Sequence, residues 1–163
     1  MDPQLSLLLR LFDEGYNHKA WHGPNLLGAI RGLSAEEAAW RPAEERHNIW
    51  EIVIHCAYWK YSVRRRILGL KRGSFPYKGS NWFPRLDHLT ADRWKHDLHL
   101  LATEHHQLRE TILGLRPLRL KQTTPGGTMR IDRLIYGVAA HDIYHAGQIQ
   151  VLKKLLKGVV QKG

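Results

Sequence analysis

The 163-residue chain contains a single cysteine, Cys56, and no apolar run near the roughly 20 residues that a membrane-spanning helix requires. One cysteine excludes an intramolecular disulfide framework and a multi-cysteine zinc site. The N-terminal LSLLLRLF is short and interrupted by Arg10, so it favours the start of a helix over a secretory signal. These absences predict a cytoplasmic protein without a membrane span.

Helical periodicity runs through most of the chain, and turn-forming residues fall between the periodic segments. It predicts four long helices: residues 3–32 with an interruption around 21–24, a second from Asn48 to Leu70, a third from Thr90 to Pro117, and a fourth from about Thr128 to Leu156, ended by Gly158. Ser34 and Glu37 fit the capping box of a short additional helix. We expect residues 1–163 to form a single all-α domain, a four-helix bundle.

A long connection separates the second and third predicted helices. Residues 71–89, KRGSFPYKGSNWFPRLDHL, combine two Gly, two Pro and four aromatic residues without a regular period. Connections of this length inside a compact domain are often functional.

The predicted inner face of the fourth helix is apolar at both ends and polar in the middle. Its residues are Leu134, Val138, His141, His145, Gln148, Leu152 and Leu155. Histidines four residues apart lie on one helix face, so His141 and His145 can bind one divalent cation together. The alternative is a pair of hydrogen-bonded core histidines.

His55 is the best candidate for a third metal ligand, because it flanks the apolar stripe of the second helix between Ile52 and Trp59. Three neutral imidazoles would leave one coordination position open, as in catalytic metal sites. Taken alone, however, His55 also fits a packed, hydrogen-bonded histidine.

Three stretches resemble the DinB-like family: IWEIVIHCAYW (49–59), YGVAAHDIYHAGQIQVLKKLL (136–156) and WHGPNLLGAIRGLSAEEAAWRP (21–42). The resemblance implies a four-helix bundle with an unusually long connection, often a homodimer. It also implies one divalent metal of the zinc, nickel or iron type, held by one histidine of the second helix and two of the fourth. Those positions match His55, His141 and His145.

Members of this family include thiol-dependent transferases and isomerases as well as assigned hydrolases. The resemblance therefore implies a metal-dependent hydrolase or thiol transferase, in which the metal activates water or a low-molecular-weight thiol against a small-molecule substrate. No individual catalytic residue is assigned.

Four further residues are candidates for the pocket or for contacts to the ligands. Gln148 would hydrogen-bond a ligand or a substrate, or be an ordinary buried amide. Asp142 would orient an imidazole, or serve a neighbouring helix or solvent. His105 fits a satisfied core histidine better than a fourth ligand or a general base. His22 would line the pocket mouth, or cap a helix or face solvent.

The chain carries 25 Lys and Arg against 15 Asp and Glu, a net charge of +10. The basic residues cluster at the end of the second helix and near the C-terminus: Arg64, Arg65, Arg66, Lys71 and Arg72, and Lys153, Lys154, Lys157 and Lys162. Cations are favoured near helix C-termini in any protein. The excess nevertheless leaves an alternative: a non-enzymatic, metal-stabilised dimeric bundle that binds an anionic partner such as nucleic acid.

Overall fold

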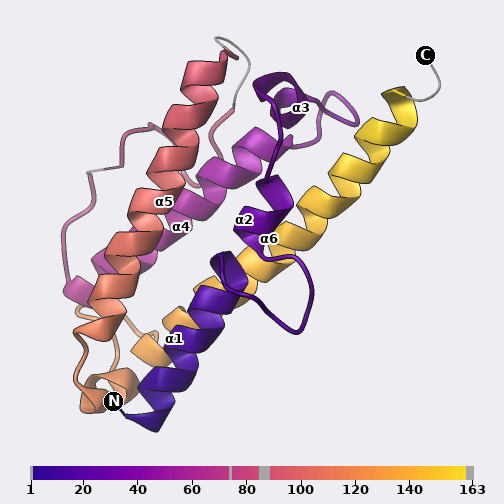
Figure 1. Cartoon of the computed structure of the whole chain (residues 1–163). Coiled ribbons are helices and arrows are strands. Elements are labelled where there is room, and N and C mark those ends of the chain that lie inside the picture. The colour runs from indigo at the N-terminus through magenta and orange to yellow at the C-terminus, as the bar shows by residue number, and fades with distance from the viewer. Residues whose placement is uncertain (1, 74, 85–88, 161–163) are drawn as a thin grey trace.

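The computed structural model describes residues 2–73, 75–84 and 89–160, and these residues are helical with connecting loops (Figure 1). The helices are α1 (Pro3–Tyr16), α2 (Leu26–Ile30), α3 (Ala35–Ala39), α4 (Ile49–Leu68), α5 (Ala91–Leu113) and α6 (Ile131–Val160), with a 3₁₀ helix at Pro117–Lys121. In the described part of the chain, β-type pairing is limited to an isolated bridge between Thr123 and Arg130. The predicted all-α class is confirmed.

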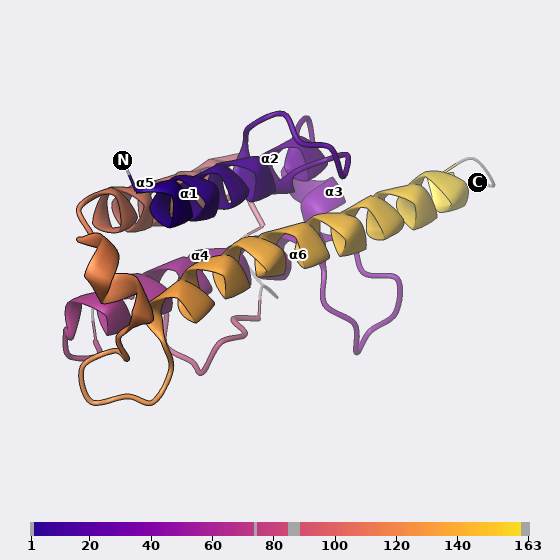
Figure 2. The ribbon, with the colours of Figure 1, turned by 90° about the horizontal axis from the view of Figure 1, so that it is seen from below.

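The long helices lie in two layers, α1 with α5 and α4 with α6 (Figure 2). α4 contacts both α5 and α6, and α1 also contacts both of them. Two clusters of buried apolar side chains lie between the helices, one including Phe12 and Ile135 and the other including Trp50 and Ile149. Residues of α6 belong to both clusters, so this helix borders the core along much of its length.

Side-chain caps explain where three of the helices begin. Ser34 and Glu37 form the predicted capping box of α3: the Ser34 N–H donates to the Glu37 carboxylate at 2.8 Å, and the Glu37 N–H donates to the Ser34 hydroxyl at 3.2 Å. Asn48 and Thr90 accept the backbone N–H three residues further on and cap α4 and α5. These predicted starts are confirmed.

The first and last predicted helices differ from their expected ranges. The interruption covers residues 17–25, so α1 and α2 are separate helices, and the Asn25 side chain caps α2. Gly158 does not end α6, which continues to Val160, since glycine in a helix costs only about 1 kcal/mol relative to alanine. None of the helices in the described ranges combines the length and hydropathy of a membrane-spanning segment.

The connection between α4 and α5 is anchored on α4 by its aromatic rings. The Phe75 ring lies 5.3 Å from that of Tyr58, and Phe83 is buried in the same cluster. The expected connection also includes residue 74 and residues 85–88, which lie outside the described ranges. This anchoring brings Asn81 and Trp82 to the middle of α4, where His55 lies.

Candidate metal centre

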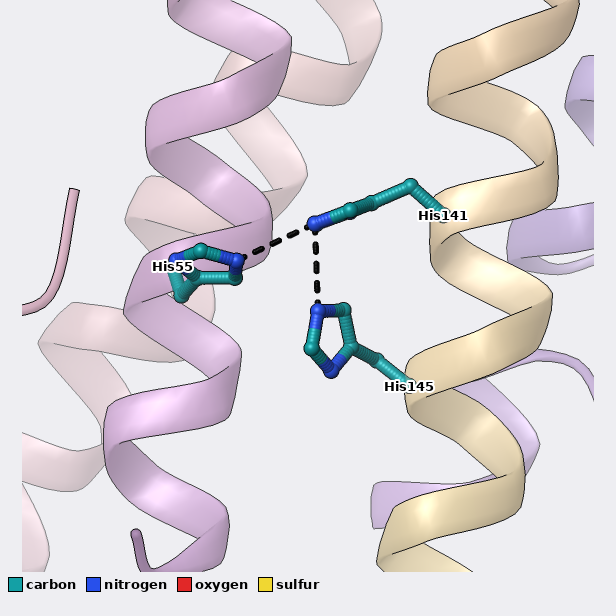
Figure 3. Close-up of side chains that lie close together, drawn as sticks. All are labelled: His55, His141 and His145. Atoms are coloured by element: carbon teal, nitrogen blue, oxygen red, sulfur yellow. Dashed lines mark hydrogen bonds between the residues drawn. The ribbon is translucent and has the colours of Figure 1, made fainter.

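Three histidines converge between α4 and α6 (Figure 3). His55 comes from α4, while His141 and His145 lie one turn apart on α6 and point across to it. Nε2 of His141 lies 3.1 Å from Nε2 of His55 and 3.1 Å from Nε2 of His145. His55 and His145 are buried and His141 is partly exposed, so the group lies at the edge of the core.

These separations fit three ligands of one ion. Two nitrogen atoms bound at 2.0–2.1 Å are about 2.9 Å apart at a right angle and about 3.4 Å apart at the tetrahedral angle. The observed 3.1 Å falls between these limits for both pairs. The potential ligand atoms of His55, His141 and His145 all lie within 4.8 Å of one another, so the three side chains could hold one metal ion.

In two of the three histidines, a hydrogen bond from Nδ1 determines which ring nitrogen carries the proton. His55 Nδ1 donates to the backbone carbonyl of Asn81 at 2.6 Å, and His145 Nδ1 donates to Oε1 of Gln148 at 2.6 Å. In the neutral rings both Nε2 atoms then present lone pairs toward His141. A single proton on His141 Nε2 cannot form good hydrogen bonds to the Nε2 atoms of both His55 and His145. A cation between the rings would accept a lone pair from all three nitrogens.

Burial keeps these imidazoles uncharged. Desolvation lowers the pKa of His55 to about 4 and that of His141 to about 3, and it also lowers the pKa of His145. Repulsion from a proton on His145 or His55 would also oppose protonation of His141, which lowers its pKa further. All three rings are neutral at physiological pH, which is the state that binds a metal.

A stack of rings holds His55 from its other side. Trp82 stacks on His55 with ring centroids 3.8 Å apart, and His47 stacks on Trp82 at 3.7 Å. His47 Nδ1 in turn lies 3.0 Å from the buried carboxylate of Glu51, which also accepts from Arg41. The sequence reasoning missed this assembly, although the aromatic residues in the long connection were a signal for it.

Two of the other candidate residues on α6 have clear partners. Gln148 accepts from His145 as described, and its Nε2 donates to the Tyr144 hydroxyl at 3.0 Å, so it hydrogen-bonds a candidate ligand. Asp142 is fully buried and pairs with Lys60 of α4. It therefore serves a neighbouring helix, and the solvent alternative is wrong.

His105 and His22 do not join the three histidines. His105 stacks between Phe12 and Tyr16, with ring centroids 4.4 and 3.7 Å away, which confirms a packed core histidine. Its Nδ1 has no hydrogen-bond partner in the described part of the chain, so the ring is packed but not fully hydrogen-bonded. His22 and Trp21 are exposed in the turn after α1, and neither lines the two hollows that border the three histidines.

Cys56, His141 and Asp142 also bring potential ligand atoms within 4.8 Å of one another. Burial raises the pKa of the Cys56 thiol well above its usual value, so the thiol stays protonated. The Asp142 carboxylate is already paired with Lys60. This second group is therefore a poor metal site, and Cys56 is a buried core residue.

Hollows lie on two sides of the histidines. One, of about 440 Å³, is lined by residues of α4 and the first half of α6 and ends at His141. The other, of about 520 Å³, includes His47, Trp82 and Gln148, which contact one another or the ligands. A molecule in either hollow would lie beside the candidate metal position.

One of three comparisons with known proteins found a match. The family model described as the DinB superfamily matches residues 19–149, which include all three histidines. Neither the search of curated proteins nor the search of solved structures found a match. Because the matched region covers most of its 163 residues, the chain belongs to the DinB superfamily.

Proposed function

We propose that the protein is a metal-dependent enzyme in which His55, His141 and His145 hold one divalent transition metal. The observation that carries the proposal is the convergence of three Nε2 atoms at 3.1 Å contacts, with two outer nitrogens already donating elsewhere. Membership of a superfamily that typically binds metal supports it. Zinc, nickel and iron all suit imidazole ligands, and cellular supply selects among them.

Such a metal keeps an open coordination position, at which water or a low-molecular-weight thiol would lose a proton near neutral pH. The protein supplies the ligands in neutral form and orients two of them through Asn81 and Gln148. The two hollows give room for two molecules beside the ligands. This arrangement supports transfer of a thiol to a small electrophile as well as hydrolysis of a small substrate.

We also propose that the described helices form a four-helix bundle, a single domain that acts as a homodimer in the cytoplasm. The two-layer packing of α1, α4, α5 and α6 supports the bundle. Large side chains exposed along α6 support a dimer: Tyr136, Tyr144, Val151 and Leu155. The lone, buried Cys56 is compatible with a reducing compartment.

The test is elemental analysis of untagged protein, followed by assays with panels of esters and of thiols with electrophiles. We expect about one transition metal per chain in the native protein and almost none in His141→Ala/His145→Ala. His106→Ala, which changes an exposed histidine of α5, is the matched control and should retain the metal. Native protein that neither contains a metal nor binds added zinc or nickel would refute the proposal.

The alternative function, binding of nucleic acid through the basic surface, rests on the net charge of +10. Part of this charge is engaged in the fold: Arg64 pairs with Glu104, and Arg65 and Lys153 donate to the carbonyls of Leu70 and Ala29. Retention on DNA or RNA, with log affinity falling linearly against log salt, would favour this alternative.

A further inference from the structure

The hollow that ends at His141 has a polarity gradient along its length. Its walls come from Trp59, Val63 and Arg66 of α4, Met129, and a run of α6 from Arg133 to His141. On the two helices, the apolar lining residues lie between the histidines and the arginines, and Arg66 and Arg133 are the lining residues furthest from the histidines. A candidate metal ligand thus lies at one end and two cations at the other.

The antiparallel course of α4 and α6 places these groups in order (Figure 1). Leaving the histidines, α4 presents Trp59, Val63 and Arg66 on successive turns. α6 runs the opposite way and presents Val138, Leu134 and Arg133 in the same spatial order. The rise from His141 to Arg133 is about 12 Å, at 1.5 Å per residue.

Trp59 connects the apolar wall to the histidines. Its ring centroid lies 6.2 Å from that of His55 and 6.1 Å from that of His141. A molecule lying along this ring would therefore have one end beside the candidate metal position.

Several arginines of the bundle are ion-paired, whereas Arg66 and Arg133 have no acidic partner among the described residues. Arg64 pairs with Glu104, Arg109 with Asp13, and Arg130 with Asp132. Within the described ranges, the side chains of Arg66 and Arg133 are exposed and have no hydrogen bond or ion pair. Guanidinium groups bind carboxylate and phosphate in a planar, charge-assisted geometry, so these two are suited to an anionic group.

We propose that this hollow binds a substrate with an elongated apolar body and a terminal anionic group, held by Arg66 and Arg133 so that its other end reaches the metal. The inference rests on the proposed function, because the reactive end is placed at the ion that His55, His141 and His145 hold. The apolar body replaces water along Trp59, Val63 and Leu134. The distance from His141 to the arginines then selects ligands by length.

The experiment uses Co²⁺-loaded protein and three thiols: 8-mercaptooctanoate, its uncharged analogue 8-mercaptooctanol, and the short mercaptoacetate. A thiolate-to-cobalt absorption band reports contact with the metal, and calorimetry gives each affinity. We expect 8-mercaptooctanoate to bind at least tenfold more tightly than either other thiol, because only it reaches both the metal and the arginines. A charge-assisted pair of this kind is worth about one to two orders of magnitude in affinity.

Arginine variants separate the contribution of charge to ligand affinity from that of apolar packing. Arg66→Gln/Arg133→Gln should remove the preference for the carboxylate and leave the affinity for 8-mercaptooctanol unchanged. Arg93→Gln, which removes an exposed arginine of α5 that does not line the hollow, should behave as the native protein.

The outcomes distinguish this proposal from the proposed function. Failure to take up Co²⁺, or absence of a thiolate band with every thiol, would refute the metal function itself. A band with equal affinities for all three thiols, or a preference that survives in the double variant, would overturn the groove proposal alone. A double variant that changes only the oligomeric state would assign this face to a second copy of the chain, and would also overturn it.

Discussion

The ammonium group of Lys60 on α4 forms an ion pair with the carboxylate of Asp142 on α6, and both side chains are fully buried. Lys60 Nζ also lies 4.9 Å and 5.1 Å from the ring centroids of Phe12 and Tyr16 on α1. Asp142 directly follows His141. The pair therefore links the two helices that carry the candidate ligands and fixes their relative position at the site.

Lys60→Met should destabilise the protein strongly. Burial raises the pKa of the Asp142 carboxyl, and Lys60 is the partner that opposes this shift. Removing one member of a buried pair typically costs 3–5 kcal/mol, so we expect a loss of roughly that size in the free energy of unfolding, measured in urea. Arg130→Gln, which breaks the more exposed pair with Asp132, should cost roughly 1 kcal/mol or less.

The double variant Lys60→Met/Asp142→Leu removes both members of the buried ion pair and tests whether the loss of stability comes from the unpaired carboxyl. With apolar side chains at both positions, no buried carboxyl is left without a partner. The double variant should therefore recover most of the stability that the single variant loses. A single variant as stable as the native protein would show that the pair does not hold α4 against α6.

Gln148→Leu should weaken metal binding without removing a ligand. The Gln148 carbonyl accepts from His145 Nδ1 at 2.6 Å and so orients the ring and favours its metal-binding tautomer. Loss of such an outer hydrogen bond typically costs 10–100-fold in metal affinity, and we expect a decrease in that range when zinc is titrated against a competing chelator. Gln150→Leu, two residues along α6, is the matched control; equal affinity in both variants would contradict this role.

Local sequence signals predicted the helices well because they depend on neighbours in the chain. Ser34 with Glu37, Asn48 and Thr90 cap the helices that they were expected to cap. Each cap involves a side chain and a backbone group three residues away. Interactions of this range can be read from the sequence alone.

The orientation of α6 was harder to predict, because it depends on a residue distant in the chain. The predicted inner face centred on His141, His145 and Gln148, but Asp142 is fully buried while His141 and Gln148 are only partly so. Leu155, expected on the inner face, is exposed. The buried Lys60 compensates the charge of Asp142, and periodicity on α6 cannot reveal a partner on α4.

The residues that surround the three histidines were also hard to predict, because they are distant in the chain. The sequence identified His55, His141 and His145, and the structure brings them together. It did not identify Asn81 or Trp82, because their places depend on how the long connection folds back on α4. The pairing of His141 with His145 follows from helical spacing, whereas the groups that orient the candidate ligands come from tertiary structure.

His105 should make the stability of the metal-free protein sensitive to acid. Burial between Phe12 and Tyr16 lowers the pKa of His105 to about 2, and the nearby charges of Lys60 and Arg109 lower it further. Below its ordinary value of 6.5, the unfolded chain binds a proton at this histidine and the folded chain does not. The free energy of unfolding therefore falls as pH decreases below about 6.5, by up to roughly 1.4 kcal/mol per pH unit from this residue.

His105→Phe keeps an aromatic ring in the stack and removes the proton-binding site, so it isolates this contribution. Urea unfolding of the metal-free proteins from pH 7 to pH 5 should show a shallower loss of stability in His105→Phe than in the native protein. His55, His141 and His145 contribute to the slope in both proteins, so their share cancels in the comparison. His106→Phe, at an exposed neighbour, should retain the native slope. If His105→Phe has the native slope as well, the buried ring accepts a proton in the folded state, and the stack with Phe12 and Tyr16 does not exclude charge.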